Sequence, residues 1–173
     1  MDLEKIVDML SYTIPSITTG LVAYYFFVNY TKAEEQKFKL SLLRENQKQS
    51  LPLKLQAYER MVLFLERINP SNLVVRIPSV NNDKNAYATS VISAIEQEFE
   101  HNLTQQIYIS NKCWSVIVTA KNATIQLIKK TALQESVLNA QDLREAILKA
   151  TLSNTAPSAT ALGFIKEEVR DFM

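Results

Sequence analysis

The chain has 173 residues, a net charge of +1, one cysteine and two glycines. This length suffices for one domain, or for a small domain with an appendage. The near-neutral charge argues against a nucleic-acid-binding protein, which usually carries a basic face. One cysteine excludes an internal disulfide and a thiolate metal cluster, and two separated glycines exclude a glycine-rich phosphate loop. The many Leu, Ile, Glu, Gln, Lys and Ala residues predict an all-helical fold.

The N-terminal segment is predicted to cross a membrane. Residues 9–31 contain no formal charge, and as a helix they would extend about 34 Å, against about 30 Å for a bilayer core. We therefore expect a short N-terminus and one transmembrane helix over residues 1–31, rather than a buried soluble helix or a cleaved signal peptide. Acidic residues precede the segment and Lys and Arg follow it, which places the N-terminus outside and the rest in the cytoplasm.

One face of this predicted span carries small and polar side chains. Ser16 and Gly20 are four residues apart, a spacing that lets two helix backbones approach closely in lipid. The face therefore predicts packing against another transmembrane helix, from a partner or from a second copy, and chance spacing is the alternative. Its residues are Thr13, Ser16, Gly20, Ala23 and Tyr24.

The remaining residues are predicted to form a linker and one helical domain. Residues 32–50 are polar and indicate a juxtamembrane helix or linker, with a heptad signal too short to establish a coiled coil. Leu51-Pro52 indicates a new helix start, and residues 51–173 are expected to form a cytoplasmic bundle of four to five amphipathic helices. The expected helices cover about 52–68, 85–105, 111–132, 140–152 and 158–172, and residues 73–77 are expected to be a short helix or a strand. Asn69 can cap a short helix with Pro70 at its first position, and Ser110 is a natural cap for the helix over 111–132.

Three segments of this domain resemble a known family: LPLKLQAYERMVLFLERINPSNLVVRI (51–77), EFEHNLTQQIYIS (98–110) and ATALGFIKEEVRDFM (159–173). The family consists of small single-span proteins of unknown function from the Bacteroidetes. The resemblance implies a bacterial inner-membrane location, with the helical domain in the cytoplasm. It implies no activity, ligand or catalytic residue.

The only histidine lies in a Glu-x-x-His motif. Glu98 and His101 have the spacing of ligands in carboxylate-bridged di-iron bundles, but such a site needs two motifs and this chain has one histidine. No metal or other cofactor is therefore expected. Together with Asn102 and Gln105, these residues predict either a polar seam between helices or a surface that binds a partner or ligand.

Two arginines and the cysteine are further candidate functional groups. Arg60 and Arg67 are seven residues apart on one helix face, where they could contact an anionic headgroup or form a solvated, ion-paired surface. Cys113 lacks an obvious activating base and is expected to be a buried thiol. Trp114 is expected to lie in the core.

The sequence contains no recognisable catalytic constellation. It predicts a non-enzymatic, membrane-anchored interaction protein, an accessory or scaffold subunit of an inner-membrane assembly. The expected partners are the lipid bilayer and other membrane protein subunits or copies of the same chain, and no nucleic acid. The alternative is a membrane-tethered regulator that binds a small ligand or a lipid headgroup within its bundle.

Overall fold

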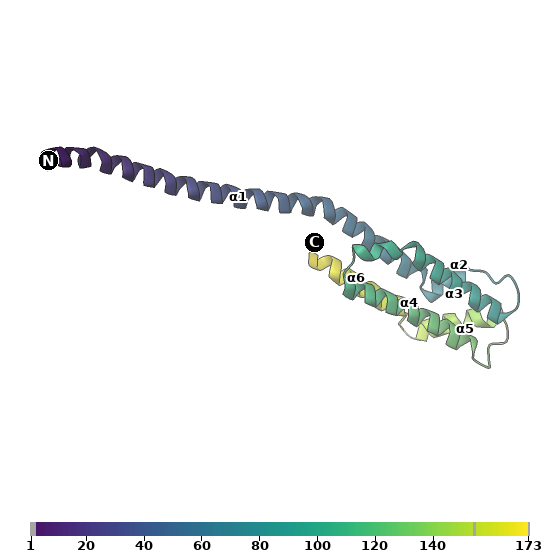
Figure 1. Cartoon of the computed structure of the whole chain (residues 1–173). Helices are drawn as coiled ribbons and strands as arrows, with labels where there is room; N and C mark the ends of the chain where they lie inside the picture. Colours follow the sequence, from purple (N-terminus) through teal and green to yellow (C-terminus); the bar gives the residue numbers. More distant parts are fainter. Residues whose placement is uncertain (1–2, 154, 173) are drawn as a thin grey trace. The chain divides into compact units, whose positions relative to one another are not determined.

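The computed structural model describes residues 3–153 and 155–172, and the side chains of residues 3–8, 10 and 12 lie outside this description. The described residues form six α-helices and one 3-10 helix (Figure 1). The chain divides into two units, Met1–Ser50 and Leu51–Met173. The helices are α1 (Leu3–Arg67), α2 (Pro70–Arg76), α3 (Lys84–His101), α4 (Asn111–Ala132), α5 (Ala140–Ser153) and α6 (Pro157–Phe172), and the 3-10 helix is η1 (Leu103–Ile107).

The structure corrects the predicted transmembrane helix. Residues 11–32 lie in α1, but no helix in the described part of the chain combines the length and the apolar character needed to cross a membrane. A helix without formal charge is therefore not always a hydrophobic one, and here hydroxyl-bearing side chains in the first half of the segment lower its mean hydropathy. These residues are Ser11, Thr13, Ser16, Thr18 and Thr19.

The predicted helix start at Leu51-Pro52 is also wrong, because α1 includes both residues and continues to Arg67. A proline inside a helix removes one backbone hydrogen bond, which is a local cost. Strong helix formers follow at once in the segment LKLQA, residues 53–57, and favour continuation of the helix. Residues 32–50, predicted as a helix or linker, are helical throughout.

Side-chain caps define where the later helices begin. The Asn69 side chain accepts a hydrogen bond from the backbone N–H of Ser71 (3.1 Å), with Pro70 in the first turn of α2. Ser110 accepts one from Cys113 at the start of α4 (3.1 Å). Each cap satisfies an N–H group that the helix itself leaves unpaired. The short helix at Asn69-Pro70 and the Ser110 cap are thus confirmed.

The predicted end of the helix over 85–105 is wrong. Helix α3 ends at His101, and η1 follows it. The Asn102 side chain donates a hydrogen bond to the backbone carbonyl of Glu98 (2.8 Å). Asn102 itself is buried, so its amide satisfies a carbonyl at the helix end and the chain leaves the helical path there.

Helix α4 is central to the compact unit, residues 51–173. It packs against α3, α5 and α6, and α2 packs against α5. The apolar core includes fully buried side chains from five helices, which the amphipathic patterns of the sequence supply. Among them are Phe64 and Leu65 of α1, Leu73 of α2, Ile95 of α3, Ile117 of α4 and Leu143 and Ile147 of α5, and Ile165 of α6 lies beside them with 1% exposure.

Truncation of a buried leucine in α5 should destabilise this unit strongly. Leu143 is fully buried, whereas Leu152 on the same helix is 87% exposed. We expect Leu143→Ala to lower the free energy of unfolding by about 2–5 kcal/mol, because it removes buried methyl groups and leaves a cavity. Leu152→Ala should change it by less than about 0.5 kcal/mol. Urea denaturation followed by circular dichroism measures both, and equal losses would contradict the described core.

Candidate functional site

The compact unit has a polar hollow where α1 ends beside α2 and α3. We call it the arginine hollow. Its volume is about 360 Å³. Charged and polar side chains from three helices meet here, which is the feature expected of a ligand site rather than of a core cavity. The lining residues are Arg67, Arg76, Ile77, Ala94, Gln97, Glu98 and His101.

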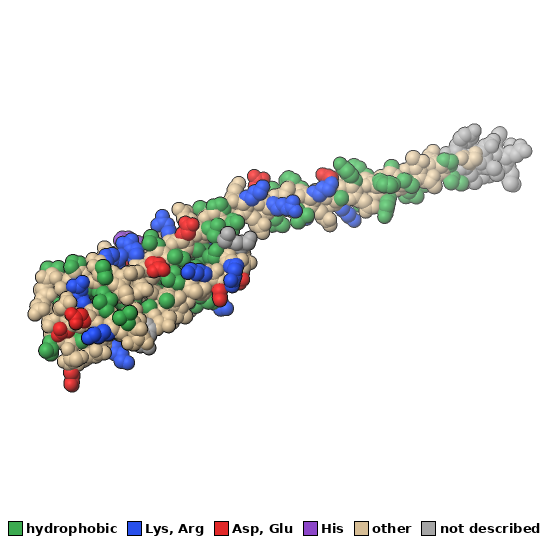
Figure 2. All heavy atoms as spheres, turned by 180° about the vertical axis from the view of Figure 1, so that it is seen from behind, with side chains coloured by type: hydrophobic (Ala, Val, Ile, Leu, Met, Phe, Trp, Pro, Cys, Tyr) green, Lys and Arg blue, Asp and Glu red, His purple; other side chains and the backbone are tan. Residues whose placement is uncertain are grey.

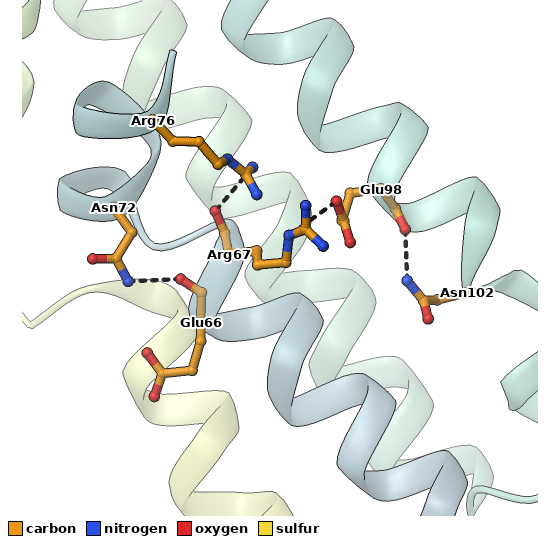
Figure 3. A network of polar contacts seen from close by, with 6 residues as sticks. All are labelled: Glu66, Arg67, Asn72, Arg76, Glu98 and Asn102. Carbon is orange, nitrogen blue, oxygen red and sulfur yellow. Dashed lines mark hydrogen bonds and ion pairs between the residues drawn. The ribbon is translucent and has the colours of Figure 1, made fainter.

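The two arginines of the hollow are held by contacts at the end of α1. The Nε atom of Arg67 lies 3.2 Å from a carboxylate oxygen of Glu98, in an ion pair between α1 and α3. Arg76 donates to the backbone carbonyl of Arg67 (3.4 Å), and Asn72 donates to that of Glu66 (2.8 Å). Figure 3 shows these contacts. The side chains of α2 thereby satisfy carbonyls that the end of α1 leaves unpaired.

Half of the predicted polar seam contributes to this hollow. Glu98 and His101 line it together with Arg67. Asn102 is buried instead, and Gln105 belongs to η1 because α3 ends before it. Arg60, predicted to act with Arg67, is exposed on α1 and does not line the hollow.

Sequence reasoning missed Arg76, because its position depends on how α2 folds back after Asn69-Pro70. The Asn69-Pro70 turn could have indicated the position of Arg76. A helix that starts at a proline directly after another helix changes the chain direction within a few residues. The two guanidinium groups and His101 surround a hollow that contains one carboxylate, Glu98. Arginine recognises carboxylate and phosphate groups with paired hydrogen bonds, so the arrangement suits an anionic ligand.

A second polar cluster, in which Tyr58 and Cys113 are buried and Glu168 is half-buried, lies between α1, α4 and α6. The Tyr58 hydroxyl donates to a carboxylate oxygen of Glu168 (2.5 Å). Burial, followed by the hydrogen bond to Glu168, raises the pKa of Tyr58. Burial, followed by the charge of Glu168, raises the pKa of Cys113 to about 12. Cys113 is fully buried, as predicted, so its thiol stays neutral near pH 7 and is a poor nucleophile.

Aromatic contacts join three helices next to this region. The ring of Phe99 lies 5.6 Å from that of Phe64 and stacks on Trp114 with a centroid distance of 5.4 Å. The ammonium of Lys121 lies 4.6 Å from the Phe99 ring centroid and forms an ion pair with Glu96 (2.8 Å). Trp114 is half-buried against the core, so it has a packing role here.

In the described part of the chain, no three His, Cys, Asp or Glu side chains gather in a way that could hold a metal ion. The Glu98 carboxylate contacts Arg67 instead. Glu98, the first residue of the Glu-x-x-His motif, therefore has a structural role in this ion pair.

The second candidate surface is an exposed stretch of α1, residues 14–43, which we call the apolar segment after its large hydrophobic side chains. The residues at 32–37 within it, KAEEQK, are mostly polar. Figure 2 shows hydrophobic side chains along the apolar segment. Contiguous exposed apolar surface is rare on soluble proteins and marks interaction sites. The large exposed residues are Ile14, Ile17, Leu21, Val22, Tyr24, Tyr25, Phe26, Phe27, Tyr30, Phe38, Leu40, Leu42 and Leu43.

The predicted small-residue face lies at the start of this surface. Thr13, Ser16, Gly20, Ala23 and Tyr24 are all exposed on α1. The Thr13 hydroxyl donates to the backbone carbonyl of Met9 (2.9 Å). A Cβ atom built on Gly20 would meet nothing within 4 Å, so this position leaves open space beside the helix.

The sequence profile of DUF7935, a family of unknown function, matches residues 4–172. The chain belongs to this family. No curated protein and no solved structure matches it. The predicted membership of a family of unknown function is confirmed. The arguments on the function of this DUF7935 member rest on its own residues.

Cys113 should resist alkylation in the folded protein. Its pKa of about 12, against an ordinary value of 9.0, lowers the thiolate fraction about 1,000-fold. Because the unfolded chain ionises first, the stability due to the neutral thiol is complete below pH 9 and is lost as the pH rises from about 9 toward 12. We expect iodoacetamide at pH 8.5 to label Cys113 at least about 100-fold more slowly in buffer than in urea.

The matched control for this labelling experiment is Ser115→Cys, because Ser115 is exposed on the same helix. That cysteine should react at similar rates in buffer and in urea. Fast labelling of Cys113 in the folded protein would mean that the thiol is accessible.

Proposed function

We propose that this protein is a non-enzymatic interaction protein, an accessory or scaffold subunit that binds another protein through the apolar segment of α1. The observation that carries the proposal is the exposure of that segment. Tyr24, Tyr25, Phe26 and Phe27 are consecutive, and each is about two-thirds exposed (67–69%). Consecutive side chains surround a helix rather than line one face of it, so these rings present apolar surface in several directions.

Aromatic residues support a protein partner in particular. Tyr and Phe are enriched at the centres of protein interfaces, where large rings exclude water at a low cost in side-chain entropy. Leaving such surface in water costs about 25 cal/mol per Å² relative to burying it. Binding of a partner over this segment would therefore be favourable without any further rearrangement of the compact unit.

The compact unit supports a role without catalysis. Its one cysteine is buried and its thiol is held neutral by burial and by Glu168. Nucleophilic catalysis needs an activated and accessible group, and this thiol is neither. The bacterial origin and the inner-membrane location expected from the resemblance stay predictions, and the proposed interaction does not depend on them.

Site-specific photo-crosslinking in cells tests the proposed function. A photoreactive amino acid replaces Tyr25, which is 68% exposed, or Val80, which is 98% exposed in the loop before α3. We expect a discrete crosslinked species from position 25 that contains a stoichiometric protein partner, because interfaces concentrate at exposed aromatic surface.

Position 80 serves as the control, because it is accessible but lies outside the apolar segment. It should yield no discrete species. Absence of any crosslink at position 25, with full expression and a folded compact unit, would contradict the proposal.

We propose a second candidate function on the basis of the arginine hollow: binding of a phosphate-bearing small ligand or headgroup by a regulator. Arg67, Arg76 and His101 supply hydrogen-bond donors around a hollow of about 360 Å³. Arg67 is paired with the Glu98 carboxylate, whereas Arg76 makes a long hydrogen bond (3.4 Å) to a neutral carbonyl. Arg76 is therefore the group more readily able to bind a phosphate oxygen. Such contacts are charge-assisted and stronger than neutral hydrogen bonds.

Titration calorimetry with glycerol 3-phosphate tests this second function. We expect Arg76→Gln to weaken binding at least about tenfold, because loss of one charged hydrogen bond costs about 1.5–3 kcal/mol. Arg60→Gln, which removes an exposed arginine of α1 outside the hollow, should leave binding unchanged. No heat of binding to the wild-type protein, or equal losses in both variants, would exclude the hollow as the site.

A further inference from the structure

The apolar segment carries a heptad repeat that becomes visible only once α1 is known to be one helix across residues 14–42. Apolar side chains recur in it with alternating spacings of three and four residues, which is the pattern of a coiled-coil seam. Two polar residues, Thr31 and Glu35, interrupt the repeat. In the usual heptad letters, position a is Ile14, Leu21, Val28, Glu35 and Leu42, and position d is Ile17, Tyr24, Thr31 and Phe38.

Most apolar seam residues are exposed to solvent. The Ile, Leu, Tyr and Phe residues of the seam are exposed, and Val28 is half-buried. A seam over residues 14–42 comprises about four heptads and is about 43 Å long, at about 1.5 Å per residue. Four heptads are enough for a coiled coil to be argued from sequence, whereas residues 32–50 taken alone are too short.

We infer that the apolar segment binds the same segment of a second copy of this chain, in a parallel, two-stranded coiled coil. This inference rests on the proposed function, because it names the protein that covers the apolar segment. In a parallel pair, each a residue faces the a residue of the second copy, and each d residue faces its own counterpart. Ile14 and Val28 at position a are β-branched, which suits two strands, although no d position carries the leucine that completes this preference.

The flanking positions are complementary in this arrangement. A parallel coiled coil brings each g residue beside the e residue five positions later in the other chain. Glu34 thereby lies beside Lys39 of the second copy, and Phe27 lies beside Lys32, where a cation can face the ring. None of the g–e pairs of this segment brings like charges together. The pairs are Thr13–Thr18, Gly20–Tyr25, Phe27–Lys32, Glu34–Lys39 and Ser41–Asn46.

Gly20 fits the same arrangement by its size. The space around a Cβ atom at this position is open to 4 Å, and its g–e counterpart is the large side chain of Tyr25 from the second copy. Within one chain, Glu34 contacts Lys37 (3.0 Å) in an exposed pair. Lys37 lies at position c, outside the seam, so that contact and the pairing of Glu34 with Lys39 of the second copy are compatible.

The direction of the second helix follows from these charges. An antiparallel pair would place e residues beside e residues and g residues beside g residues, and would separate Glu34 from Lys39. The parallel pair also makes Glu35 face its own counterpart at an a position. Thr31 and Glu35 are therefore two neighbouring polar layers of the seam. The Glu35 layer opposes two like charges, which costs stability.

Sedimentation equilibrium of the full-length protein tests the seam with two neighbouring substitutions. Leu21 lies at position a and Val22 at position b, and both are exposed, at 62% and 56%. We expect a wild-type dimer at micromolar concentration. Leu21→Glu should raise the dissociation constant at least tenfold, whereas Val22→Glu should leave it within about twofold of wild type, because only Leu21 faces the second copy.

A cysteine crosslink tests direction and register independently of any loss of helix in Leu21→Glu. Ile14→Cys places a thiol at position a, and in a parallel, in-register pair the two thiols lie close enough for a disulfide. We expect this variant to form a disulfide-linked dimer in a glutathione redox buffer. The control Thr19→Cys, at the outer position f, should not. Wild-type Cys113 is fully buried and should not crosslink.

Several results would overturn the inference. They are a monomeric wild-type protein, equal effects of Leu21→Glu and Val22→Glu, and absence of a disulfide in Ile14→Cys. If the wild-type protein is monomeric but position 25 crosslinks to a different protein, the proposed function stands and the coiled coil fails. If it is monomeric and position 25 crosslinks to nothing, both fail.

Discussion

The contact between Phe64 and Phe99 holds the end of α1 against α3, and the arginine hollow depends on it. Phe64 is fully buried, and Phe99 lies between it and Trp114 of α4. Arg67 follows Phe64 by three residues, and Glu98 immediately precedes Phe99. Because residues three apart on a helix lie on neighbouring parts of its surface, packing of the two rings brings Arg67 and Glu98 to ion-pair distance at the edge of the core.

Helix α1 has apolar side chains in two stretches, one buried and one exposed. Between Ala57 and Leu65, α1 presents a buried apolar face to the compact unit. Between Ile14 and Leu43, it exposes apolar side chains at heptad positions. The hydrophobic effect favours burial of both stretches. The stretch near Phe64 is buried by the chain's own helices. The exposed stretch is the surface on which the proposed interaction and the proposed pairing with a second copy both depend.

A cluster of polar groups lies inside the compact unit. Tyr58, Glu168 and Cys113 lie together where α1, α4 and α6 meet, and burial raises the pKa of both the phenol and the thiol. Neutral, hydrogen-bonded groups stabilise such a site, because an unpaired buried charge would be costly. The polar groups able to contact a ligand lie at the other region, around Arg67 and Arg76.

The sequence alone determined the features that depend on near neighbours in the chain. Asn69-Pro70, Ser110 and the burial of Cys113 were predicted, because caps and amphipathic spacing act over one or two turns. The predicted transmembrane helix is wrong, because a stretch rich in Ser and Thr can lack charge without being apolar. Only the tertiary structure decided that Arg76 joins Arg67 and Glu98, because this depends on how α2 packs after the turn. It also decided that α3 ends at His101 and that α1 continues through Pro52. Propensity is too weak at such boundaries to determine where a helix ends, and packing and capping contacts determine it instead.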